Sequence, residues 1–108
     1  MARKDEIALA LRIIAPRMPD GDHDAVLYRA VESRGLAHAS PQAAAWLSLS
    51  AYVRHDYSDY DALLADGYDQ DQARFFCKDV INAVLKDWGC KLRVGDELPH
   101  PGPQPKDR

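Results

Sequence analysis

The sequence has only two cysteines, no long apolar run and no secretory leader, and these absences exclude several classes of protein. Cys77 and Cys90 form no CxxC pair, which argues against a disulfide scaffold or a zinc knuckle. We expect Cys77 to be buried on the apolar side of a helix, since free cysteine is among the most buried residue types. No apolar segment approaches the length of about 18 residues that a membrane span needs, so we expect a cytoplasmic protein with no membrane partner.

The chain also lacks an excess of basic residues. It has 17 Asp and Glu against 14 Lys and Arg, for a net charge of −3. Non-specific binding to nucleic acid usually depends on an obvious basic excess. A DNA partner would therefore need a local basic face, or a metal ion that bridges protein carboxylates to phosphate. Some basicity lies in the N-terminal third, at Arg3, Lys4, Arg12, Arg17, Arg29 and Arg34.

Several catalytic signatures are missing. The sequence contains no HExxH, no GxSxG, no P-loop and no GxGxxG. Zinc hydrolysis, serine hydrolysis and nucleotide binding therefore lose support, because each of these chemistries depends on one of those arrangements.

Apolar residues recur at helical spacing along most of the chain, with helix start and stop signals between them. Ser40-Pro41 is an N-cap followed by proline at the first helical position. Ser58 with Asp61, and Asp69 with Gln72, are capping-box patterns. Helices are expected to begin near residues 4, 24, 41, 58 and 69. These signals predict an all-α fold, a small bundle of four to five helices.

Two of these helices have a predicted core face. In the helix that starts at Pro41, the stripe is Ala44, Leu47 and Ala51, and three consecutive alanines indicate a close approach to a neighbouring helix. Trp46 lies off this stripe, which assigns it to a second packing face or a subunit contact. In the last helix, which Gly89 ends, the residues spaced for burial are Ala73, Phe76, Val80, Val84 and Trp88.

At 108 residues the chain is expected to form one domain. We assign residues 1–94 to a single helical domain. Beyond it, prolines alternate with non-apolar residues at positions 99, 101, 103 and 105, so this segment cannot build helical or sheet hydrogen bonds. Residues 95–108 are therefore predicted to be a disordered, Pro-rich tail.

The segment from Arg54 to Arg74 concentrates the reactive side chains of the chain, with six aspartates between positions 56 and 71. The first interpretation is structural: most of these aspartates are helix caps or first-turn charges that favour the helix dipole. Tyr60 then packs in the core with its hydroxyl at the surface.

Two chemical interpretations compete with the structural one. In the first, Asp59 and Asp61 ligate Mg²⁺, which prefers oxygen ligands. Because residues two apart on a helix point about 200° apart, these two carboxylates could converge only where the chain turns. In the second, His55 is a general acid or base, and a neighbouring carboxylate orients its ring.

The ordered pattern of this region resembles a known family over about residues 44–89. The pattern is Arg54-His55, Ser58, Tyr60-Asp61, Leu63-Leu64, Gly67, Ala73-Arg74, Val84-Leu85 and Trp88. It is similar to that of domain of unknown function 2293, in which threonine is usual at the position of Ser58. The first forty residues and the tail carry no recognisable motif of that family.

The resemblance implies an activity, because a small member of the family, the bacterial apoptosis endonuclease, is linked to DNA cleavage after DNA damage. By this resemblance Arg54 and Arg74 would hold phosphate with Tyr60 in the binding set. His55 would move a proton, and Asp61 would orient His55 or ligate a cation.

The leading hypothesis is therefore a DNA-acting protein, a metal-dependent DNA endonuclease of a bacterial DNA-damage response. Catalysis would fall to His55 and Asp61, with Mg²⁺ held by Asp59 and Asp61. One alternative is a non-enzymatic helical interaction module, a homodimer with Trp46 or Trp88 in its contact surface. Another is a DNA-binding regulator, although no helix pair presents a basic recognition helix.

Overall fold

The computed structural model describes residues 2–95, and this part of the chain contains five α-helices, one short 3₁₀ helix and no strand. The helices are α1 (Arg3–Ile14), α2 (Asp20–Glu32), η1 (Arg34–Leu36), α3 (Pro41–Asp56), α4 (Tyr60–Ala65) and α5 (Gln70–Asp87). The prediction of an all-α bundle of four to five helices is confirmed. The predicted disordered tail is residues 95–108, and all of it except Gly95 lies outside the described residues. Among the helices described, none is long and apolar enough to span a membrane.

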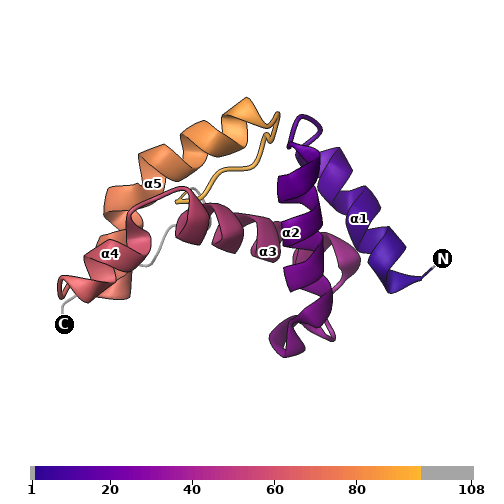
Figure 1. Ribbon diagram of the computed structural model, residues 1–108, viewed down its shortest axis with the longest axis horizontal. Helices are drawn as coiled ribbons and strands as arrows, with labels where there is room; N and C mark the ends of the chain where they lie inside the picture. Colours follow the sequence, from indigo (N-terminus) through magenta and orange to yellow (C-terminus); the bar gives the residue numbers. More distant parts are fainter. Residues whose placement is uncertain (1, 96–108) are drawn as a thin grey trace.

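α3 is the central helix, since it contacts α1, α2, α4 and α5. In Figure 1, α1 and α2 lie at one end of α3 and α4 at the other, while α5 runs from α4 back towards the loop between α1 and α2. The buried side of α3 includes Ala44, Ala45, Leu49 and Val53. The small alanine side chains allow a neighbouring helix to approach α3 closely, as expected. The predicted buried stripe is wrong at Leu47, which is exposed. Other helices pack on two sides of α3, so its buried surface is wider than one stripe and leaves Leu47 outside it.

α2 begins four residues earlier than predicted, at Asp20 rather than near Asp24. Gly21 lies in its first turn, where the backbone N–H groups have no helical partner in any case. Asp20 and Asp22 add negative charge at the positive end of the helix dipole. Gly35, predicted to end this helix, instead lies within η1, and Arg3 fixes that segment by donating to the carbonyl oxygens of Leu36 and Ala39 at 2.7 Å each.

Two of the three predicted N-caps form. The Ser40 hydroxyl accepts a hydrogen bond from the Ala43 N–H at 3.0 Å. Asp69 and Gln72 make the full capping box, with reciprocal bonds of 2.8 and 3.0 Å. The capping box at Ser58 and Asp61 is wrong, because α4 begins one residue later than that pattern requires and Asp59 stands at its N-cap without a side-chain cap bond.

The buried face of α5 is displaced from the predicted one. Its buried residues include Ala73, Cys77, Ile81 and Leu85, which face α3 and α4 at intervals of one helical turn. Burial of Cys77 is confirmed, and Trp88 is buried as predicted. Phe76 and Val80, predicted to be core, are exposed instead. Burial of Trp88 also removes it from any subunit contact surface.

Candidate functional site

The turn between α3 and α4 brings the reactive residues of the sequence together. α3 ends at Asp56, and the Tyr57 N–H still donates to the Val53 carbonyl at 2.9 Å. The Ser58 hydroxyl then donates to the Arg54 carbonyl and accepts a bond of 3.3 Å from the Tyr60 N–H. These bonds reverse the chain within three residues, so the first turn of α4 returns to the last turn of α3.

His55 and Asp61 meet across this turn, with Nδ1 of the imidazole 2.9 Å from Oδ1 of the carboxylate. An ionised carboxylate only accepts hydrogen bonds, so the Nδ1–H group donates. In a neutral imidazole with this tautomer, Nε2 carries the lone pair. The His55 side chain is 35% exposed and that of Asp61 62%. Solvent and substrate can therefore reach a histidine whose tautomer a carboxylate fixes, the arrangement that general acid–base catalysis uses.

Tyr60 lies beneath both His55 and Arg54. It is 3% exposed. Its ring is edge-on to the His55 ring at 5.4 Å between centroids, and Cζ of Arg54 is 5.1 Å from the Tyr60 centroid. The tyrosine thus packs as the structural interpretation predicts, and its buried ring holds the two polar side chains in place.

Arg54 carries a charge that nothing in the described part of the chain neutralises directly. Its Nε is buried and has no hydrogen-bond partner there. Burial, and then the positive charge of Arg74 on α5, lower the pKa of the Arg54 guanidinium, while Tyr60 and Asp61 act in the opposite direction. The charges of Arg54 and Arg74 therefore repel each other, and an anion bound between two such groups would relieve that repulsion.

The two predicted metal ligands, Asp59 and Asp61, have different surroundings. Asp61 is engaged with His55, whereas Asp59 is exposed at the N-cap of α4. Within residues 2–95, no three His, Cys, Asp or Glu side chains gather closely enough to hold a metal ion. Coordination of Mg²⁺ by Asp59 and Asp61 stays a prediction.

A second polar cluster, at Asp22, Tyr52 and Tyr57, was not predicted. The hydroxyls of Tyr52 and Tyr57 both donate to Oδ1 of Asp22, at 2.6 and 2.7 Å. Cζ of Arg29 lies 5.5 Å from the centroid of the Tyr52 ring. No sequence signal links these residues, because Asp22 is 30 and 35 positions away from the two tyrosines.

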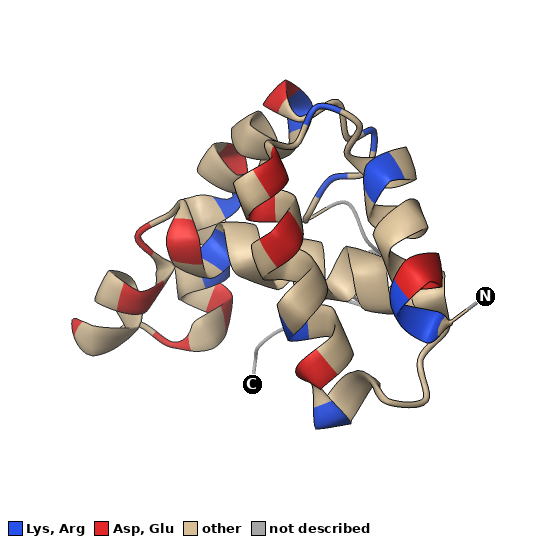
Figure 2. Cartoon of the chain, turned by 45° about the vertical axis from the view of Figure 1, so that its right-hand side comes forward, with Lys and Arg blue, Asp and Glu red and all other residues tan. Residues whose placement is uncertain are grey.

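Three of the six basic residues of the N-terminal third are engaged in hydrogen bonds to the backbone. Arg3, Arg12 and Arg17 each donate to backbone carbonyl oxygens, and Arg17 thereby caps the end of α5 at Lys86 and Asp87. Figure 2 shows Lys and Arg scattered along the chain, while Asp and Glu are frequent on α4 and the start of α5.

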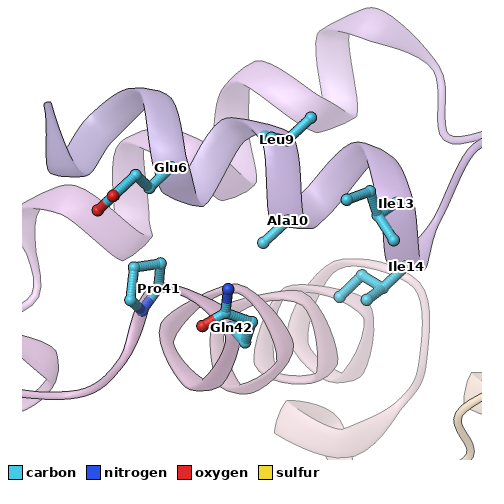
Figure 3. Close-up of a pocket in the computed structure, with 7 residues that line it drawn as sticks. All are labelled: Glu6, Leu9, Ala10, Ile13, Ile14, Pro41 and Gln42. Atoms are coloured by element: carbon cyan, nitrogen blue, oxygen red, sulfur yellow. The ribbon is translucent and has the colours of Figure 1, made fainter. Parts of the chain in front are cut away.

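A groove of about 570 Å³ lies elsewhere, between α1 and the start of α3. Its lining is mainly apolar: Glu6, Leu9, Ala10, Ile13, Ile14, Pro41 and Gln42. In Figure 3, Ala10 and Ile14 face the start of α3, whereas Leu9 points away from it. None of the predicted catalytic or binding residues lines this groove.

The family described as uncharacterized conserved protein (DUF2293) matches residues 10–89. The chain belongs to this family. The DUF2293 match begins within α1, so the prediction that the first forty residues carry no family pattern is wrong. The matched residues also include both polar clusters, around His55 and around Asp22. No curated protein and no solved structure matches the chain.

Proposed function

We propose that this DUF2293 chain acts on DNA as a phosphodiester hydrolase, with its site at Arg54, His55, Asp61 and Arg74. In its most specific form, the proposal is a DNA endonuclease of a DNA-damage response, the activity that the resemblance to the bacterial apoptosis endonuclease implies. The observation that supports it is the contact between His55 and Asp61, with the buried, unpartnered Nε of Arg54 one residue before His55 and the charge of Arg74 acting on Arg54.

In the proposed reaction, Arg54 and Arg74 bind the non-bridging oxygens of a phosphodiester. Guanidinium groups suit this role because their planar N–H groups match phosphate oxygens in pairs. Nε2 of His55 takes a proton from a water molecule as the water oxygen bonds to phosphorus, the ester P–O bond breaks, and the leaving sugar oxygen takes a proton from solvent. Asp61 stabilises the imidazolium that forms, and the two arginines stabilise the charge on the phosphorane oxygens.

Mg²⁺ is part of the proposal as a cofactor that Asp59 and Asp61 would hold. If it binds, it would supply further charge neutralisation at the phosphate. His55, Arg54 and Arg74 would keep their roles. His55 contacts one carboxylate oxygen of Asp61, and the other oxygen could bind the metal.

The proposal is tested by incubating supercoiled plasmid with the purified protein in Mg²⁺ and in chelator. We expect nicking by the wild type, and a loss of at least about a hundredfold in His55→Ala and Asp61→Ala, the usual range for a general acid or base. Arg34→Ala is the matched control, because Arg34 is an exposed arginine of η1 outside the cluster. Equal nicking by all four proteins would indicate a contaminating nuclease and contradict the site.

A second candidate function is a non-enzymatic homodimer, favoured by the groove along α1. Ile13 is 68% exposed there, an unusual position for a large apolar side chain with no partner. Trp46, a predicted contact residue, is only partly exposed and packs against the core. Sedimentation of wild type and Ile13→Ser at several concentrations tests this candidate.

A DNA-binding regulator remains the third prediction. A salt-dependent gel shift without cleavage would favour it over both other functions.

A further inference from the structure

The outer face of α5 carries an exposed aromatic cluster, formed by Phe75, Phe76 and Tyr68, with Val80 beside it. Phe75 is 69% exposed and Phe76 57%. The Phe76 ring lies edge-on to both neighbours, at 5.5 Å from Tyr68 and 5.7 Å from Phe75 between centroids. This aromatic cluster belongs to neither polar cluster, and the helix turns it away from α3, because Ala73, Cys77 and Ile81 fill the opposite face.

Such a cluster has the composition of an interface core. Contiguous exposed apolar groups on a folded protein mark interaction sites, and aromatic residues are the side chains most enriched at the centres of such sites. The three rings already contact one another, and the capping box at Asp69 and Gln72 fixes the first turn of α5 beneath them. Little conformational entropy would be lost when a partner covers rings that are held in this way.

The charges around the aromatic cluster determine which partner fits. Asp71 and Asp79 are four residues before and after Phe75 and therefore lie on its side of the helix. Asp66 and Asp69 flank Tyr68, and all four aspartates are exposed. The cations nearest in sequence are Arg74 and Lys78, and Nζ of Lys78 lies 5.7 Å from the Phe75 centroid. Carboxylates thus outnumber cations two to one at the rim.

The acidic rim favours some binding partners over others. A second copy docked through the same face would bring two rims of like charge together, and nucleic acid would meet the same repulsion. A basic segment with apolar side chains along one side would instead bury the rings and pair its cations with the aspartates.

We infer that the aromatic cluster of α5 docks a basic amphipathic segment of a partner protein. The rings provide the anchors, and the aspartates at the rim provide selectivity for a positively charged partner. The inference goes beyond the proposed hydrolysis and does not depend on it, because neither its residues nor its test involves His55 or Asp61.

The test uses a fluorescein-labelled synthetic peptide of about five helical turns, with Leu on one face and Lys on the other, and a matched peptide with Glu in place of Lys. Fluorescence anisotropy then gives the Kd of each peptide for the full chain. We expect the Lys peptide to bind at least about tenfold more tightly than the Glu peptide. We also expect Phe75→Ser and Asp71→Lys to weaken it by about tenfold each.

Tyr28→Ser is the control, because Tyr28 is as exposed as Phe75 but lies on α2. Unchanged binding by this variant supports the inference, and weakening equal to that of Phe75→Ser overturns it. Equal binding of the two peptides also overturns it. So does a self-association of the wild type that Phe75→Ser abolishes, since the occupant would then be a second copy. Both replaced side chains are exposed, and circular dichroism confirms that each variant is folded.

Discussion

Tyr57, the residue that directly follows α3, donates a hydrogen bond of 2.7 Å to Oδ1 of Asp22 in α2. Tyr52 donates to the same oxygen at 2.6 Å, and the Tyr57 ring lies edge-on to the Trp88 ring with 5.4 Å between centroids. One carboxylate therefore ties α2 to the end of α3, and the Tyr57 ring extends this contact to the end of α5. The turn that brings Asp61 to His55 starts from this anchored residue.

The anchor predicts a loss of stability at alkaline pH. The hydrogen bond to Asp22 raises the pKa of Tyr57, and burial together with the bond to Asp22 raises the pKa of Tyr52. Above the ordinary tyrosine pKa of about 10, the unfolded chain loses these protons while the folded chain keeps them. The two tyrosines therefore contribute fully to the free energy of unfolding below about pH 10, and this contribution declines as the pH rises further.

The measurement is the melting temperature from pH 8 to pH 11, in the wild type and in the double variant Tyr52→Phe, Tyr57→Phe. The alkaline decrease should be smaller in the double variant. Tyr28→Phe changes an exposed tyrosine and should leave the wild-type slope intact. Identical slopes in all three proteins would show that Asp22 does not hold these protons.

The two aspartates Asp69 and Asp66 provide a test of helix capping. Asp69→Ala removes the capping box of α5 and should lower the free energy of unfolding by about 1 kcal/mol. Asp66→Ala removes a carboxylate from the C-cap of α4, where negative charge opposes the helix dipole, and should change stability by less than about 0.5 kcal/mol. Urea denaturation measures both, and equal losses would contradict the assignment of Asp69 as the cap.

Two glycines with positive φ should respond differently to a methyl group. Gly67 has φ of 104° with open space around it, whereas a Cβ on Gly89, where φ is 83°, would lie 3.0 Å from Cγ of Pro16. Both Gly→Ala changes carry the backbone cost of about 1–2 kcal/mol for a left-handed residue. Gly89→Ala carries an additional steric cost, so it should lower the melting temperature more than Gly67→Ala does. The reverse order would mean that Gly89 does not pack against Pro16.

The repulsion between Arg54 and Arg74 predicts that one of them can be removed without loss of stability. Arg74→Gln should leave the free energy of unfolding unchanged or raise it by up to about 0.5 kcal/mol, as residues kept for function rather than stability often do. Arg12→Gln is the comparison, because Arg12 donates to the Met18 carbonyl and pairs with Asp20. Arg12→Gln should lower the free energy of unfolding by about 1 kcal/mol. A larger loss in Arg74→Gln than in Arg12→Gln would make Arg74 structural.

The sequence predicted the features that depend on neighbours along the chain. The caps at Ser40 and Asp69 and the helix stops at Gly67 and Gly89 are set within a few residues of backbone. The pairing of His55 with Asp61 came from the family resemblance and not from local spacing, although only one turn separates the two residues. Asp22 with Tyr57 could not be predicted, because packing of α2 against α3 creates it. The exposure of Phe76 was missed for a related reason: apolar spacing does not say which of two overlapping faces the neighbouring helices cover.

The measurement that tests the account most directly is an NMR titration of ¹⁵N-labelled protein with a short DNA oligonucleotide that carries a phosphorothioate backbone to prevent cleavage. If the cluster is a phosphodiester site, the Arg54 Nε–H signal and the signals of His55, Asp61 and Arg74 shift first and together. Arg74→Ala should then weaken binding by at least about tenfold, while Arg34→Ala leaves it unchanged. Shifts confined to other surfaces, or none at concentrations where wild-type protein nicks plasmid, would contradict the assignment.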